Sequence, residues 1–272
     1  MGSAVTPSNP FTIVAVAILV YLAATVLHEA AGHAAVCALL GGRVISVTSV
    51  DCLCDYRAIS RNRIRAVEAG GTLANLALGL VCAAALALYP PAPPVWRYFL
   101  FLSAVVNLFL AGGYLMVSPF ANFGDWAEFL EGMPGRLVWQ EALTAAGLLV
   151  SLATLRFGRT QIEYFCGAGD AFRGRQAWLL TALPYVAGGI ASCLGALRNP
   201  VGMALVATSA AASTFGGTCW LLWIGYFTAK YGPNAAVDPV PIPFSPAWIA
   251  VAGVALAGWI AVLGPGIGPR RR

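Results

Sequence analysis

The stretch His28-Glu29-Ala30-Ala31-Gly32-His33 lies inside an apolar run that extends over residues 11–40. It contains both histidines of the chain, and no charged residue precedes Glu29. A run of this length is long enough to cross a membrane as a helix. Ionisable groups at membrane depth are costly and mark functional sites by default. We therefore expect a transmembrane helix that carries a functional site. The competing interpretation is a pair of structural histidines bonded to backbone carbonyls.

The composition of the whole chain indicates an integral membrane protein. Of its 272 residues, 59% are hydrophobic and 10% are charged, whereas soluble domains contain about 25% charged residues. Long uninterrupted apolar runs exclude a β-barrel. We expect an all-α polytopic membrane protein, a bundle of about six to seven transmembrane helices with a short surface β segment after the first. The expected spans are residues 11–40, 69–89, 96–117, 137–155, 177–197, 201–229 and 245–263.

The basic residues lie where they can contact a membrane surface. The net charge is +5, and arginines occupy the predicted loops and the C-terminus, which suits contact with lipid headgroups. We expect the lipid bilayer as their partner, and no nucleic acid, in a multi-pass protein of the plasma (inner) membrane. Arginines within residues 57–65 place the loop after the first span in the cytoplasm. Residues 156–178 are expected to form a polar loop.

A short β segment is expected between the first two spans. Gly41 and Gly42 end the helix, and residues 43–50 contain β-branched side chains in partial alternation. Such a pattern is typical of one or two strands. We expect them to lie at the membrane surface.

The spacing of His28, Glu29 and His33 is close to a known catalytic pattern. In H-E-x-x-H on a helix, two imidazoles hold zinc and the glutamate is the general base. Here one residue is inserted, so the histidines are five residues apart and diverge by roughly 140° on a regular helix. A single-turn π-bulge would bring them together again. Gly32 makes such a distortion easier.

Asp125 is the predicted third ligand of the metal. A catalytic zinc keeps three protein ligands, so a partner for the two histidines is needed. Pro119 and Gly124 are expected to break the helix before Asp125, and irregular backbone at this depth is tolerated where it lines protein or a cavity. Glu128 and Glu131 are the rival ligands. Alternatively, Asp125 caps a helix that begins at Trp126.

Three asparagines are weaker candidates for a supporting role. Asn75 and Asn107 are polar side chains within apolar spans, and Asn122 lies in the break before Asp125. Asn75 either orients a catalytic group or a substrate backbone, or it makes an interhelical hydrogen bond. The same alternatives hold for Asn107.

Residues 20–130 resemble the site-2 proteases, which are intramembrane zinc metalloproteases. In that family a glycine and a short surface sheet follow the zinc-binding helix, as residues 41–50 do here. A Gly-x-x-x-Asn segment then opens a further helix, and Gly71-Thr72-Leu73-Ala74-Asn75 is similar to it. A later Asn/Pro-containing break leads to an aspartate ligand, which residues 119–125 match in kind. The chain departs from the family in the residue inserted before His33 and in Gly-Asp-Trp where Asp-Gly is usual. H-E-x-x-G-H itself occurs in a soluble family of zinc dipeptidyl-peptidases.

The expected function is that of an intramembrane zinc metalloprotease. His28, His33 and Asp125 would bind Zn²⁺, and Glu29 would take a proton from the attacking water. The substrate would be a locally unwound transmembrane segment of another membrane protein. Residues 1–135 would form the metalloprotease-like core, and residues 136–272 would add further transmembrane helices. Two alternatives are a metal-binding transporter, which uses the same residues as a coordination or proton path, and a catalytically inactive membrane scaffold.

Overall fold

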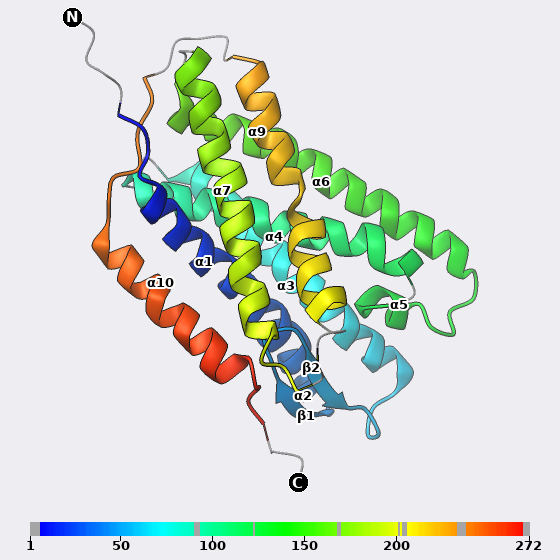
Figure 1. Ribbon diagram of the computed structural model, residues 1–272. Coiled ribbons are helices and arrows are strands. Elements are labelled where there is room, and N and C mark those ends of the chain that lie inside the picture. Colours follow the sequence, from blue (N-terminus) through cyan, green and yellow to red (C-terminus); the bar gives the residue numbers. More distant parts are fainter. Residues whose placement is uncertain are drawn as a thin grey trace, which may run out of the picture.

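The computed structural model describes residues 6–89, 93–121, 123–167, 170–200, 202, 206–232 and 238–268. It is a bundle of helices with a small hairpin at one end (Figure 1). Three of the helical segments are π-helices, written η. In chain order the elements are α1 (Pro10–Val26), η1 (Leu27–Ala34), α2 (Ala35–Leu39), β1 (Arg43–Val47), β2 (Cys52–Asp55), α3 (Arg61–Leu88), α4 (Pro94–Ala121), α5 (Asp125–Phe129), α6 (Arg136–Cys166), α7 (Asp170–Ala196), η2 (Val206–Gly216), α9 (Trp220–Lys230), α10 (Pro246–Gly258) and η3 (Trp259–Leu263).

Six helical stretches in the described part of the chain are long and apolar enough to cross a membrane. This agrees with the expected helical bundle of a membrane protein. The stretches are Pro10–Leu39, Arg61–Leu88, Pro94–Ala121, Arg136–Cys166, Phe172–Ala196 and Pro246–Leu263.

The expected span over residues 201–229 is not one regular helix in its described part. It consists of η2 and α9, with a turn at Cys219 before α9 begins. Gly217 lies just before this turn, directly against α4. A Cβ atom added to Gly113 of α4 would lie 2.8 Å from the Cα atom of Gly217. The two glycines therefore allow the backbones of α4 and this segment to touch.

The main core lies between α1, α4, α6, α7 and α9. Helix α4 is at its centre and packs against α1, α3 and α6. Because α4 is apolar on all sides, burial on all sides is the expected placement. Members of this core with at most 1% exposure include Ile13, Val16, Val20, Phe101, Leu102, Val105, Phe109, Ile162, Phe165, Leu180, Leu221 and Ile224.

The expected polar loop over residues 156–178 is wrong. Helix α6 continues to Cys166, and α7 begins at Asp170. The helix continues because Ile162 and Phe165 are buried on one of its faces. Arg173 is 1% exposed, pairs with Glu163, and donates hydrogen bonds to the Gly167 and Thr228 carbonyls at 2.8 and 2.7 Å. Arg173, near the start of α7, therefore binds the C-terminal ends of α6 and α9 and does not face lipid.

The predicted β segment is a two-stranded antiparallel hairpin. Strands β1 and β2 pair from Arg43 opposite Asp55 to Val47 opposite Cys52. The C-terminal segment closes the hairpin from the side: Val47 and Ile267 exchange two backbone hydrogen bonds of 2.9 and 2.8 Å. Consequently, residues far apart in the chain hold the hairpin at the end of the bundle (Figure 1).

Candidate metal centre

The helix that contains both histidines is distorted at the position predicted from their spacing. Residues Leu27–Ala34 form a π-helix between the regular helices α1 and α2. The wider turn brings His28 and His33 to the same side, with ring centroids 4.8 Å apart. Gly32 has a second role that the sequence did not reveal, because a Cβ atom there would lie 2.5 Å from the Cα atom of Gly71. The glycine lets α3 cross the distorted turn closely.

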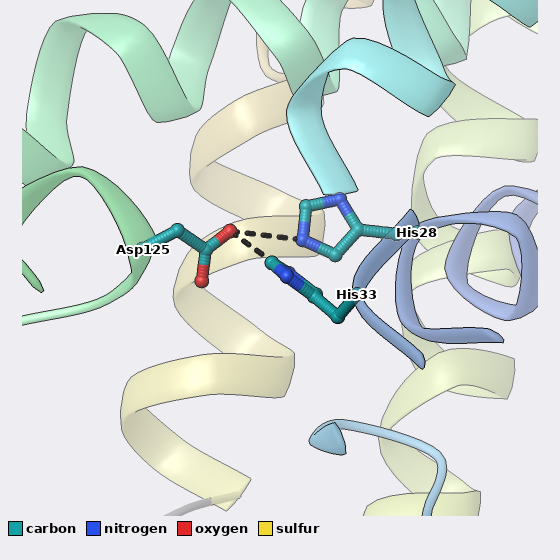
Figure 2. Close-up of side chains that lie close together, drawn as sticks. All are labelled: His28, His33 and Asp125. Atoms are coloured by element: carbon teal, nitrogen blue, oxygen red, sulfur yellow. Dashed lines mark hydrogen bonds and ion pairs between the residues drawn. The ribbon is translucent and has the colours of Figure 1, made fainter. Parts of the chain in front are cut away.

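Asp125 faces both imidazole rings from one side, with one carboxylate oxygen directed at the two of them (Figure 2). Its Oδ2 atom is 3.1 Å from Nε2 of His28 and 3.2 Å from Nε2 of His33. The three ligand atoms all lie within 4.8 Å of one another. Among the described residues these three side chains form a group that could hold a metal ion.

Each histidine is oriented through its other ring nitrogen. Nδ1 of His28 lies 2.6 Å from Oδ1 of Asn75, and Nδ1 of His33 lies 2.8 Å from the carbonyl oxygen of Val67. Both partners are acceptors, so each Nδ1 carries the proton and donates it. Nε2 of each ring faces Asp125 and is the nitrogen left to bind a metal ion, which is the usual arrangement for histidines that bind metals.

Asn75 is itself held by hydrogen bonds on three sides. Its amide nitrogen donates to the Ala24 carbonyl at 3.1 Å and to Oδ1 of Asn107 at 2.7 Å. Asn107 in turn donates to the Ser103 carbonyl at 2.9 Å. Asn75 therefore does two things at once: it bonds to the ring of His28, and it joins three helices. Asn107 acts one step further away, through Asn75.

Glycines of α3 give the metal centre its space. A Cβ atom added to Gly71 would lie 2.5 Å from Nε2 of His33 and would also overlap the ring of His28. Gly71 and Asn75 are one turn apart and therefore share a face of α3. In the Gly-x-x-x-Asn pattern, Gly71 thus leaves room for the two imidazole rings, and Asn75 provides the hydrogen-bond acceptor for His28.

Helix α5 brings Asp125 to the centre. Its N-terminus is capped by Ser118, whose Oγ accepts hydrogen bonds from the Trp126 and Ala127 amides at 3.1 and 3.3 Å. The side chain of Asp125 is therefore not needed as a cap and is free to face the histidines. Gly124, at φ 78° and ψ 178°, supplies a backbone conformation that is essentially restricted to glycine.

Pro119 does not end helix α4, contrary to the expectation. The helix continues to Ala121, with Pro119 in its last turn. A proline there lacks only one hydrogen-bond donor near an end where the helix stops anyway. The Pro119 carbonyl is used by another helix, since it accepts a hydrogen bond of 2.6 Å from the side chain of Gln140. The reversal of the chain depends on Gly124.

The arginines at the start of α3 hold α5 in place. Arg61 donates to the Glu128 carbonyl at 2.8 Å and pairs with the Glu131 carboxylate at 2.6 Å. Arg65 donates to the Phe129 carbonyl at 3.0 Å and to the Glu131 carbonyl at 3.1 Å. These contacts satisfy the C-terminal carbonyls of α5. The rival ligands Glu128 and Glu131 are not part of the metal-binding group, and Asn122 lies outside the described residues.

Glu29 lies in the interior beside the triad. Its side chain is 7% exposed, and it interacts electrostatically with His28, His33 and Asp125. Together with His28 it lines a cavity with a volume of about 30 Å³. That space is sufficient for a water molecule. Glu29 is therefore a buried carboxylate that, like His28 of the triad, borders a space that can hold water.

Two carboxylates near the centre differ in their electrostatic environment. Burial raises the pKa of Asp51, and nearby Asp125 raises it further, against the opposing effect of His33. Burial alone would also raise the pKa of Asp125, but His33 and His28 outweigh this effect and hold that pKa below its usual range. The pKa of Asp125 therefore lies below its usual range while that of Asp51 lies above its own, and a carboxylate that stays ionised suits a metal ligand.

Several residues near the site were not found from the sequence. Besides Asp51, they are Tyr114, whose ring lies 5.1 Å from that of His28, and Ser49 and Ser192, which line the cavity beside Glu29. Asp51 could have been noticed as an acidic residue in the hairpin turn between β1 and β2. The two serines and the tyrosine have no distinguishing sequence pattern.

Comparison of the chain with models of protein families, with curated proteins and with solved structures found no match.

Proposed function

We propose that the protein is an intramembrane zinc metalloprotease that hydrolyses a peptide bond in or near a transmembrane segment of a membrane protein. The observation that carries this proposal is the convergence of His28, His33 and Asp125 with Glu29 beside them. Ligand atoms about 2.1 Å from a tetrahedral zinc ion lie roughly 3.4 Å apart. The distances of 3.1 and 3.2 Å between Asp125 and the two imidazoles are close to this value.

Each residue has a distinct role in the proposed reaction. Zinc bound at the triad would act as a Lewis acid on the peptide carbonyl and would favour deprotonation of water. Glu29 takes the proton from that water and then returns it to the leaving amine, as a general base and then a general acid. Asn75 and the Val67 carbonyl keep both histidines in the tautomer that presents Nε2.

The position of the site among apolar helices supports a membrane-embedded substrate. The triad belongs to helices long and apolar enough to cross a membrane and to the short α5 beside them. A regular helix hides its carbonyls in its own hydrogen bonds. A substrate segment must therefore unwind locally before the peptide bond can reach the triad, and the site must provide partners for the backbone groups that unwinding exposes.

The test combines metal analysis with a cleavage assay. Protein purified in detergent without chelators should contain about one zinc ion per chain. When incubated with transmembrane peptides in micelles, it should produce fragments that mass spectrometry detects. Glu29→Gln removes the base and keeps the shape, so zinc should be retained while the cleavage rate falls at least about 100-fold. Cleavage at the wild-type rate by this variant would show that the base is wrongly assigned.

Other results of the same experiment would favour the alternatives. Zinc binding without cleavage of any peptide contradicts the protease proposal and favours a scaffold or a transporter. Uptake of zinc into liposomes that contain the protein would then identify transport, because a scaffold moves no metal.

A further inference from the structure

Two buried hydroxyl groups in the wall of the cavity beside Glu29 have no hydrogen-bond partner. Among the described residues, the Oγ atoms of Ser49 and Ser192 are inaccessible and unpaired, and the residues are 1% and 2% exposed. Both residues line the cavity that Glu29 and His28 also line. A buried hydroxyl without a partner is costly. Each of these two hydroxyls can donate one hydrogen bond and accept two.

Three other hydroxyls in the same wall already make hydrogen bonds. Thr25 donates to the Tyr21 carbonyl at 3.2 Å, and Ser213 and Thr214 donate to the carbonyls of Ser209 and Ala210. Each of these bonds goes back to the residue four positions earlier, as is common for Ser and Thr in helices. Ser49 and Ser192 therefore differ from these three hydroxyl residues of the wall.

The remaining wall restricts what can enter. Ala24 and Ala210 contribute only methyl groups, and Leu110 adds an apolar side chain. The cavity has a volume of about 30 Å³. A neighbouring cavity on the Asp125 side has a volume of about 480 Å³. The larger cavity shares Tyr114 with the smaller one and has mostly apolar lining residues. A small group fits the first cavity, and large apolar side chains fit the second.

We infer that the cavity beside Glu29 is the binding pocket for a small residue (Gly, Ala or Ser) next to the cleaved bond, and that the hydroxyls of Ser49 and Ser192 bind the backbone of the unwound segment at that residue. This inference rests on the proposed protease function and adds its substrate preference. An unwound segment carries free amide and carbonyl groups, which are costly in an apolar interior without partners. The two serines belong to the wall of the pocket, and their unpaired hydroxyls can supply such partners.

The first test measures cleavage of a peptide series. Once mass spectrometry has located the cleaved bond in one transmembrane peptide, the two residues that flank it are varied separately through Gly, Ala, Ser, Val, Leu and Phe. At one of the two positions, kcat/KM should fall at least about tenfold between Ala and Leu, because a tight pocket rejects extra methylene groups. Equal cleavage of the Ala and Leu or Phe peptides at both positions would overturn the inference.

Variants of the serines separate binding from folding. Ser49→Ala and Ser192→Ala should each lower kcat/KM about three- to tenfold, as expected for one lost hydrogen bond. Ser192→Val fills the pocket, so cleavage should become restricted to peptides with Gly at the selective position. Ser151→Ala is the matched control, because Ser151 is also fully buried with an unpaired Oγ but lies on α6 beside Gly112, outside the pocket. Equal effects of all three Ala variants would overturn the inference.

A binding experiment distinguishes failure of the pocket from failure of the proposed function. Fluorescently labelled peptides with Ala or Leu at each flanking position are titrated with the Glu29→Gln protein in micelles, and anisotropy gives Kd. Tighter binding of the Ala peptide that is lost in Ser49→Ala and Ser192→Ala supports the pocket even if the wild-type protein cleaves no peptide. Cleavage by the wild-type protein with no effect of either serine on Kd or kcat/KM would retain the protease and reject the pocket.

Discussion

Nδ1 of His28 and Oδ1 of Asn75 are joined by a hydrogen bond of 2.6 Å. The amide nitrogen of Asn75 faces two other acceptors, the Ala24 carbonyl and Asn107. The orientation of the Asn75 amide is therefore fixed by its surroundings, and only its oxygen can face the ring. His28 must donate this bond, so the tautomer that presents Nε2 to Asp125 is determined by a residue of a different helix.

Asn75→Ala should lower zinc affinity roughly 10- to 100-fold, the usual cost of losing a residue that orients a metal ligand. The reason is that His28 would no longer be held in one tautomer and one ring orientation. Competition with a chromogenic zinc chelator measures the affinity. Asn107→Ala is the control one step further from the metal, and its effect should be smaller. Unchanged affinity in Asn75→Ala would contradict the role given to this hydrogen bond.

Gly71→Ala should abolish zinc binding, with a loss of affinity of at least about 100-fold. The added methyl group would occupy the space at Nε2 of both His28 and His33. In contrast, Gly253→Ala in α10 adds a methyl group with no atom within 4 Å and should leave zinc affinity unchanged while slightly raising Tm. Isothermal titration and thermal unfolding of both variants check this pair. Normal zinc binding by Gly71→Ala would place the metal elsewhere.

Arg65→Met should weaken zinc binding about three- to tenfold, because the guanidinium holds the carbonyl end of α5 and thereby the position of Asp125. The bonds are partly exposed, so a larger effect is not expected. Arg63→Met provides the comparison, since the guanidinium of Arg63 donates to the Leu40 carbonyl at 3.2 Å and does not touch α5. If the two variants bind zinc equally well, the arginine contacts do not position the third ligand.

Deletion of Ala31 should abolish folding and activity although it restores the H-E-x-x-H spacing. Removing one residue from a helix turns everything before it by about 100°. Ile13, Val16 and Val20 of α1 are at most 1% exposed, and the rotation would direct them away from the core. Ala31→Ser keeps the length at an exposed position and should behave like the wild-type protein. Circular dichroism and size-exclusion chromatography in detergent follow the fold. An active deletion variant would show that the π-helix is dispensable.

The triad and the helix distortion could be predicted because they depend on local rules. A chain with only two histidines, five residues apart within an apolar run, leaves few arrangements in which both face one ion. For both side chains to lie on one face, the helix needs a wider turn that takes up one extra residue. The structure has a π-helix at this position. The prediction of Asp125 rests on a break at Pro119 and Gly124; of these two, only Gly124, with its φ of 78°, changes the direction of the chain and frees the side chain.

The residues missed by sequence reasoning act through contacts between distant segments. Arg61 and Arg65 were assigned to the cytoplasmic surface as charges, yet they bind carbonyls of α5, a segment that hydropathy patterns do not reveal. Ser49 and Ser192 are ordinary residues until the fold places both in one wall without partners. The end of α6 was misjudged because its charged residues lie on a helix whose other face buries Ile162 and Phe165.

The hairpin turn that carries Ser49 is held by residues that are synthesised much later than the metal-binding helix. The Ser49 amide donates to the Leu263 carbonyl at 2.8 Å, and Asn199 donates to Thr48 at 2.9 Å. During translation both histidines and Asp125 are made long before Leu263. Early chains can therefore assemble the metal ligands while the hairpin turn still lacks these contacts. The wall of the cavity is completed last, which delays full assembly until most of the chain has left the ribosome.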